Sequence, residues 1–256
     1  MNVGGIMERI DVAQLVLYIF WGFFAYLIYY LRREDKREGY PLETDAKRNV
    51  RVVGFPGLPE PKVFILRTGG TASVPSDRRD TREIRAVPVA PWPGAPLEPT
   101  GDGMIDGVGP ASYANRADVP DVTFEGALKI VPLRVATDFA VAHGNPDPRG
   151  MPVIGADGAV GGTVLDIWID RSEPQIRYLE VTVTGSSRRV LLPMTLAKVD
   201  AGALEIKVAS VKGRHFATVP VTRNPDAVTL REEDQISAYF AAGHLYGDAS
   251  RMGPVL

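Results

Sequence analysis

The chain has 256 residues, a formal net charge of −2, no cysteine and only three histidines. The near-zero charge provides no overall basic field for nucleic acid, and the lack of cysteine excludes a disulfide scaffold, thiolate catalysis and cysteine-ligated metal. His143, His215 and His244 have no paired spacing such as H-x-x-x-H, which argues against a multi-histidine metal site. No G-x-S-x-G, H-E-x-x-H or phosphate-loop motif indicates a hydrolase.

An uncharged apolar stretch occupies residues 12–31. About 20 such residues at ~1.5 Å rise cross a hydrocarbon core of ~30 Å, so the stretch predicts one transmembrane helix, which Asp11 would cap. The alternative is a cleaved signal peptide. That would need a shorter apolar core, a basic leader and a small-residue cleavage site, whereas bulky Tyr29 and Tyr30 stand near the end of this stretch.

The charges beside the span predict its orientation. Arg32, Arg33, Lys36 and Arg37 follow it directly, whereas Arg9 alone precedes it. Basic clusters stay on the cytoplasmic side. Residues 1–11 are therefore expected in the periplasm, and the rest of the chain in the cytoplasm.

Residues 32–127 read as an extended, Pro/Gly-rich docking segment. The charged residues are expected to extend the helix by a turn or two, until Gly39 and Pro41 stop it. One strand is predicted near 61–69, and seven prolines between 86 and 120 leave little room for regular structure. The tract is either disordered or docked on another protein, and its apolar anchors favour docking. These anchors are Trp92, Met104, Ile105 and Tyr113.

Residues 128–246 are expected to form a mainly β domain with a C-terminal helix, followed by a tail at 247–256. Short strands rich in Val, Ile and Leu begin at 130–136 and continue over 152–209, where they predict a small antiparallel barrel. Turn signals separate them at Asp157-Gly158, Thr184-Gly185 and Ala201-Gly202. A capping box at Thr229 to Glu232 starts the helix, and Gly243 is expected to end it.

Several strings of residues occur in an order that resembles the H subunit of the purple-bacterial photosynthetic reaction centre. They are YLRREDKREGYPLE (30–43), PKVF (61–64), PTGDGMIDGVGPASY (99–113), IVPLRVA (130–136), DPRGMPV (147–153), DIWIDRSE (166–173), RYLEV (177–181) and LREED (230–234). Each string alone is weak, but their colinear order over nearly the whole chain is specific. The barrel resembles the PRC-barrel family.

This resemblance implies a non-catalytic subunit of a light-driven electron-transfer complex in the bacterial intracytoplasmic membrane. The expected partners are the two pigment-binding subunits L and M, membrane lipids and a surrounding light-harvesting antenna. Bacteriochlorophyll, bacteriopheophytin, quinone and non-haem iron are expected in the partner subunits and none on this chain. The cytoplasmic domain would cap the partners, stabilise the quinone sites and assist proton transfer to the secondary quinone.

The resemblance assigns proton transfer first to Glu173, with Asp170 and Arg177 as neighbouring charges. If Asp170 pairs with Arg177, a short hairpin loop carries Glu173 at its tip. A carboxylate is suited to the role if burial or like charge raises its pKa. From the residues alone, an ordinary solvated turn with a surface ion pair explains the same pattern.

The proton entrance departs from the family pattern. Relatives carry two histidines and an aspartate just before the I-x-P strand, where this chain has Thr123, Glu125 and Ala127. Glu125 is therefore the expected titratable entry residue. His143 is expected in an exposed loop.

Tyr30 and Lys62 form a lipid hypothesis, because the family holds an anionic lipid near the membrane surface. An interfacial tyrosine and a lysine suit a phosphate headgroup; a plain interfacial anchor and a solvated lysine remain the alternative. For the whole chain, the rival function is a membrane-tethered adaptor whose barrel binds a soluble partner. The lack of a basic face counts against RNA as that partner.

Overall fold

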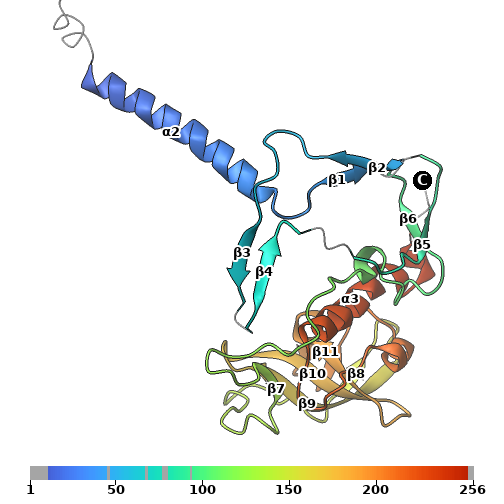
Figure 1. The fold of residues 1–256 in the computed structure, drawn as a ribbon. Helices are drawn as coiled ribbons and strands as arrows, with labels where there is room; N and C mark the ends of the chain where they lie inside the picture. Colours follow the sequence, from blue (N-terminus) through green and yellow to red (C-terminus); the bar gives the residue numbers. More distant parts are fainter. Residues whose placement is uncertain (1–10, 45–46, 67–68, 77–79, 93, 253–256) are drawn as a thin grey trace, which may run out of the picture. The chain divides into compact units, whose positions relative to one another are not determined.

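The computed structural model describes residues 11–44, 47–66, 69–76, 80–92 and 94–252. The chain divides into two compact units, and each is described by itself (Figure 1). Unit 1 holds residues 1–81 with 91–94, and unit 2 holds 82–90 with 95–256. Most of the expected N-terminal segment (1–10) and the end of the expected tail (253–256) lie outside the described residues.

Unit 1 begins with the long helix α2, Val12–Asp35. Asp11 caps it as predicted, because its Oδ1 accepts a hydrogen bond of 2.9 Å from the Ala13 N–H. No residue of α2 is buried within the chain, and in the described part α2 alone is long and apolar enough to cross a membrane. The helix continues one turn past the apolar stretch to a cap at Lys36, and Gly39 follows with a left-handed φ of 73°.

Short antiparallel hairpins occupy the tract expected to be irregular. In unit 1, β1 (Leu42–Thr44) pairs with β2 (Lys47–Val52), and β3 (Lys62–Ile65) pairs with β4 (Thr71–Val74). In unit 2, β5 (Ala86–Pro88) pairs with β6 (Leu97–Pro99). Most of the described residues in 86–120 are irregular, as expected, but β5 and β6 were not predicted. They form because prolines at the ends of short two-stranded pairs need not break the ladder.

The main sheet of unit 2 has the order β11-β10-β9-β8-β13-β12, and β7 also pairs with β9. Its strands are β7 (Ile130–Pro132), β8 (Pro152–Ile154), β9 (Val160–Asp170), β10 (Gln175–Val183), β11 (Arg189–Pro193), β12 (Lys198–Asp200) and β13 (Glu205–Lys207). The sheet is mixed rather than wholly antiparallel, because β13 and β8 run parallel. Within the described residues β11 and β12 do not pair, so closure of the barrel is not detected.

Strand β7 is shorter than the predicted 130–136. The chain turns after Pro132, whose carbonyl accepts hydrogen bonds from the N–H groups of Val135 and Ala136 at 2.9 and 3.0 Å. This early turn brings Arg134 back toward β9, where the Arg134 N–H lies 3.3 Å from an Asp166 carboxylate oxygen.

Helix α3, Leu230–Tyr246, packs against the barrel strands (Figure 1). The predicted capping box is present, since Thr229 and Glu232 exchange hydrogen bonds of 3.1 and 2.9 Å. Within the described residues, four short 3-10 helices accompany these elements: η1 (Gly109–Ala111), η2 (Met194–Leu196), η3 (Gly213–Thr218) and η4 (Ala249–Arg251). The hydrophobic core contains side chains from the sheet, from α3 and from η3. For example, the Phe216 ring of η3 lies 5.8 Å from the Phe240 ring of α3.

Gly243 does not end α3, contrary to the prediction. The helix continues three residues further because Gly243 is a packing position: a Cβ there would lie 2.5 Å from the Ser210 carbonyl oxygen. Gly161 in β9 serves the same purpose, since a Cβ would lie 2.3 Å from the Phe216 ring. Both glycines allow close approach of neighbouring elements.

Candidate functional site

The loop between β9 and β10 carries Glu173. Asp170 pairs with Gln175, so Arg171 to Pro174 form a four-residue loop. The Asp170 side chain is buried at 2% exposure, and its Oδ1 accepts hydrogen bonds from the Ser172 and Glu173 N–H groups at 2.8 and 3.2 Å. Glu173 is exposed, and its Oε2 accepts a 3.2 Å bond from the Gln175 amide. Asp170 therefore fixes the loop that presents Glu173.

Arg177 does not stand opposite Asp170, contrary to the expected register. A bulge between Ile176 and Tyr178 makes Arg177 the extra residue of β10. Its charge acts instead on Tyr178 and Glu233, because it favours the ionised forms of both.

Lys129 connects Asp170 with a neighbouring loop. Its Nζ lies 3.7 Å from Asp170 Oδ2 and 3.4 Å from Asp121 Oδ2. Asp121 precedes a tight turn in which the Thr123 N–H bonds the Ala127 carbonyl at 2.7 Å, and exposed Glu125 lies in this turn. The structure thus places the expected entry residue on a loop whose base is tied to Asp170.

Glu233 is a titratable residue of this region that the sequence reasoning missed. It is buried in the first turn of α3, and its Oε2 accepts a 2.9 Å hydrogen bond from the Tyr178 hydroxyl. Burial raises the pKa of Glu233 above its usual value, while the bond from Tyr178 and the charge of Arg177 oppose the shift. Helical spacing offered a signal, because Glu233 shares a face with buried Ile236 and Phe240.

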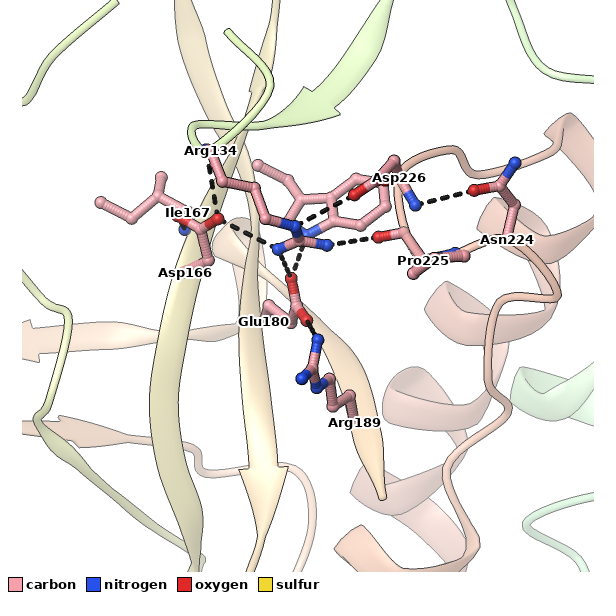
Figure 2. A network of polar contacts seen from close by, with 9 residues as sticks. Arg134, Asp166, Ile167, Glu180, Arg189, Asn224, Pro225 and Asp226 are labelled. Atoms are coloured by element: carbon pink, nitrogen blue, oxygen red, sulfur yellow. Dashed lines mark hydrogen bonds and ion pairs between the residues drawn. The ribbon is translucent and has the colours of Figure 1, made fainter. Parts of the chain in front are cut away.

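A second buried polar network lies between β9, β10 and the segment before α3, and Figure 2 shows Arg134 at its centre. Arg134 Nη1 lies 3.0 Å from Asp166 Oδ2 and 2.5 Å from Glu180 Oε2. Its other nitrogens bind the Asp226 carboxylate at 3.0 Å and the Pro225 carbonyl. Glu180 also accepts a 2.9 Å bond from the Trp168 indole and faces Arg189 at 3.5 Å.

Two family models match the chain. Residues 4–135 match the photosynthetic reaction centre H-chain N-terminal region, and residues 142–215 match the PRC-barrel domain. The first covers just over half of the 256 residues, and the second covers β8 to β13.

The chain belongs to the reaction-centre H-subunit family. This H subunit is a non-catalytic accessory subunit of the photosynthetic reaction centre. Membership confirms the resemblance drawn from the ordered strings of residues and places the chain in a photosynthetic complex rather than among free-standing adaptors. Among the described residues, no group of three or more His, Asp or Glu could hold a metal ion.

The two residues of the lipid hypothesis come together at the end of α2 in the H subunit. Lys62 Nζ lies 5.9 Å from the centre of the Tyr30 ring, within cation–π range. It also lies 2.5 Å from Glu34 Oε2. A phosphate would therefore have to share the Lys62 ammonium with a carboxylate, although the Lys62 side chain remains 47% exposed. His143 is exposed, as expected.

Proposed function

We propose that this H subunit caps the L and M subunits on the cytoplasmic side, stabilises the quinone sites and assists proton transfer to the secondary quinone. Bacteriochlorophyll, bacteriopheophytin, quinone and non-haem iron belong to those partner subunits in this proposal. The carrying observation is the cluster of titratable groups around the β9–β10 loop, where Asp170 is buried beneath exposed Glu173.

The cluster supports proton transfer for chemical reasons. Glu173 is an exposed carboxylate held on a fixed loop, so it has both access to a partner and a defined position. Glu125 and Asp121 lie on the neighbouring loop, which Lys129 joins to Asp170, and they supply groups at which protons enter. Glu233, with its raised pKa, exchanges protons closer to neutral pH than a solvated glutamate does.

In this proposal α2 anchors the subunit in the bacterial intracytoplasmic membrane. The N-terminus lies in the periplasm, and the chain that follows α2 lies in the cytoplasm. The length and hydropathy of α2 support a single span. Arg32, Arg33, Lys36 and Arg37 support the orientation. Residues 32–127 would supply the docking surface for L and M, and an antenna would surround the complex.

The experiment is Glu173→Gln in the intact, purified reaction centre. Glutamine keeps the size and hydrogen bonding of the side chain but cannot titrate. We expect slower proton-coupled reduction of the secondary quinone and unchanged initial charge separation, both measured by flash kinetics across pH. Small weak acids added to the medium should restore the rate, because they replace a missing proton donor.

Glu205→Gln is the matched control, since Glu205 lies in β13 and pairs with Lys207 at 3.2 Å. Glu205→Gln should leave both charge separation and reduction of the secondary quinone at their unsubstituted rates. If the second electron transfer is equally fast in Glu173→Gln and in the unsubstituted complex, Glu173 is only an ordinary residue of a solvated turn. A slower rate without rescue by weak acids would point to altered quinone energetics, because neighbouring carboxylates titrate as a coupled set.

A further inference from the structure

A clamped turn beside the end of α2 presents one exposed aromatic ring. The Lys36 side chain is buried at 2% exposure, and its Nζ donates hydrogen bonds of 2.5 Å to the Val53 carbonyl and 2.6 Å to the Pro56 carbonyl. It also lies 5.1 Å from the Tyr40 ring centre. A buried ammonium persists only when such partners compensate its lost hydration. The turn between Val53 and Pro56 is therefore fixed to the helix end.

Phe55, in the middle of this turn, is 86% exposed. Its ring centre lies 5.8 Å from that of Tyr29, which is itself exposed on α2. These two rings are in contact with each other, and within the described residues Phe55 leaves most of its surface uncovered, whereas Tyr29 is 39% exposed. A fixed position combined with an uncovered phenylalanine indicates that something outside the chain covers this ring.

The contact with Tyr29 gives the depth of Phe55 relative to the span. Tyr29 lies three residues before Arg32, the first charged residue after the apolar stretch. At ~1.5 Å per residue, the Tyr29 Cα lies about 4.5 Å inside that charge. This is the boundary between acyl chains and headgroups, where aromatic rings concentrate in membrane proteins.

We propose that Phe55 is a second membrane anchor, which inserts into the bilayer interface of the leaflet at the C-terminal end of α2. The inference rests on the proposed membrane span. The partner is the lipid surface itself, because the ring shares the depth of Tyr29. Around it, Gly54 and Gly57 carry no side chain and Pro56 is buried, so the turn offers no other side chain that a protein partner would recognise. Lys36 is the positioning residue: its clamp couples the turn to the last turn of the helix and thereby fixes the depth and rotation of α2.

The lack of cysteine makes a direct test possible, since Phe55→Cys gives the subunit a single thiol for a nitroxide label. The labelled subunit is studied within the intact reaction centre in phosphatidylcholine–phosphatidylglycerol vesicles, and partner thiols are subtracted with a sample that carries the unsubstituted subunit. Power saturation then compares accessibility to oxygen, which enters lipid, with accessibility to a polar nickel chelate. Two reference variants are Phe20→Cys in the middle of the span and Ser186→Cys in the exposed turn after β10.

The expected oxygen-to-nickel ratio at position 55 is higher than at 186 and lower than at 20, and it matches that of Tyr29→Cys. A ratio equal to that at 186 places Phe55 in water and overturns the inference. Low accessibility to both reagents also overturns it, because a partner protein then covers the ring. If position 20 itself gives an aqueous ratio, the proposed span fails instead, so the two failures are distinguishable.

The role of Lys36 is tested with Lys36→Met in the Phe55→Cys background, because methionine has no hydrogen-bond donor. Loss of the two carbonyl contacts should increase the mobility of the label and shift its ratio toward the aqueous value. An unchanged spectrum and depth would remove Lys36 from the proposal. An unchanged absorption spectrum of the complex checks that the Phe55→Cys subunit assembles correctly.

Discussion

Replacing Arg134 with methionine should destabilise unit 2 more than the loss of an exposed ion pair would. Methionine keeps most of the aliphatic stem, so the change removes mainly the guanidinium. That group contacts Asp166 at 3.0 Å and Glu180 at 2.5 Å, and both carboxylates are buried, at 6% and 3% exposure. The variant therefore leaves two buried carboxylates without their shared counter-charge.

The magnitude follows from what remains. Removing one partner of a buried ion pair typically costs about 3–5 kcal/mol. Arg134 is 34% exposed, and Glu180 keeps the Trp168 indole bond and the more distant Arg189, so water and Arg189 compensate in part. The exposed contact with Asp226 adds at most about 1 kcal/mol. We expect a loss of roughly 3 kcal/mol at neutral pH.

Urea unfolding of the detergent-solubilised chain, followed by circular dichroism, measures this loss. Tryptophan emission is unsuitable, because Trp21 and Trp92 also emit and the Trp168 indole bonds Glu180. Arg149→Met is the matched control, because Arg149 pairs with Asp147 at 2.5 Å but both side chains are nearly half exposed. It should cost at most about 1 kcal/mol. A double-mutant cycle with Glu180→Gln should give a coupling energy of about 1–3 kcal/mol. If Arg134→Met costs no more than Arg149→Met, the network does not stabilise the fold as reasoned.

Two further predictions concern the candidate sites. Burial raises the pKa of Glu233 above 4.5, and Tyr178, Arg177, Arg116 and Asp121 also act on it. The stabilisation that protonated Glu233 provides is therefore full below pH 4.5 and is lost as the pH rises through its pKa in the folded chain. Glu233→Gln should therefore flatten the fall in Tm as the pH rises above about 4.5. The same fall in Tm with pH in both chains would contradict the raised pKa. Lys62→Met should reduce the amount of anionic phospholipid that co-purifies with the intact complex, as measured by phosphorus analysis. The control Lys198→Met, at an exposed lysine, should leave that amount unchanged. Equal phospholipid content in both variants would mean that Tyr30 and Lys62 are plain interfacial residues.

The sequence predicts those parts of the fold that depend on local patterns. The start of α2 at Asp11, the capping box of α3 and the turn at Asp157-Gly158 follow from side chains that bond nearby backbone groups or from glycine turns. The parallel pairing of β13 with β8 has no local signal, because it joins residues about 50 positions apart. The extent of α3 was missed for the same reason, since the carbonyl of Ser210 decides why Gly243 lies inside the helix.

The candidate site shows a similar division. Family resemblance singled out Asp170 and Glu173, and the structure shows the backbone hydrogen bonds that join them. Whether they carry protons stays a prediction. The register that sets Arg177 apart depends on a bulge, and one inserted residue shifts every later pairing, so periodicity could not supply it. Glu233 reaches this region only through the packing of α3, which is a long-range contact.

Both polar networks lie on the same face of the β9–β10 ribbon. Asp166 pairs with Glu180 and Trp168 pairs with Tyr178, so these side chains alternate with the buried Ile167 and Leu179 of the opposite face. The face with Ile167 and Leu179 packs into the core, and Trp168 and Tyr178 of the other face also belong to the core. The other face carries a buried network around Arg134 and, further along, Asp170 and the partner of Glu233.

The three carboxylates of this region differ in how clearly their substitution would report on proton transfer. Asp170 both carries a charge and holds the loop through two N–H groups, so a change there alters position and titration together. Glu233 likewise combines a raised pKa with a packing contact to Tyr178. Glu173 alone among these three is exposed, and its Oε2 accepts a hydrogen bond from the Gln175 side chain rather than from the backbone of the loop. Its replacement by glutamine therefore changes proton exchange with the least change in structure, and this makes Glu173 the decisive position for the proposed function.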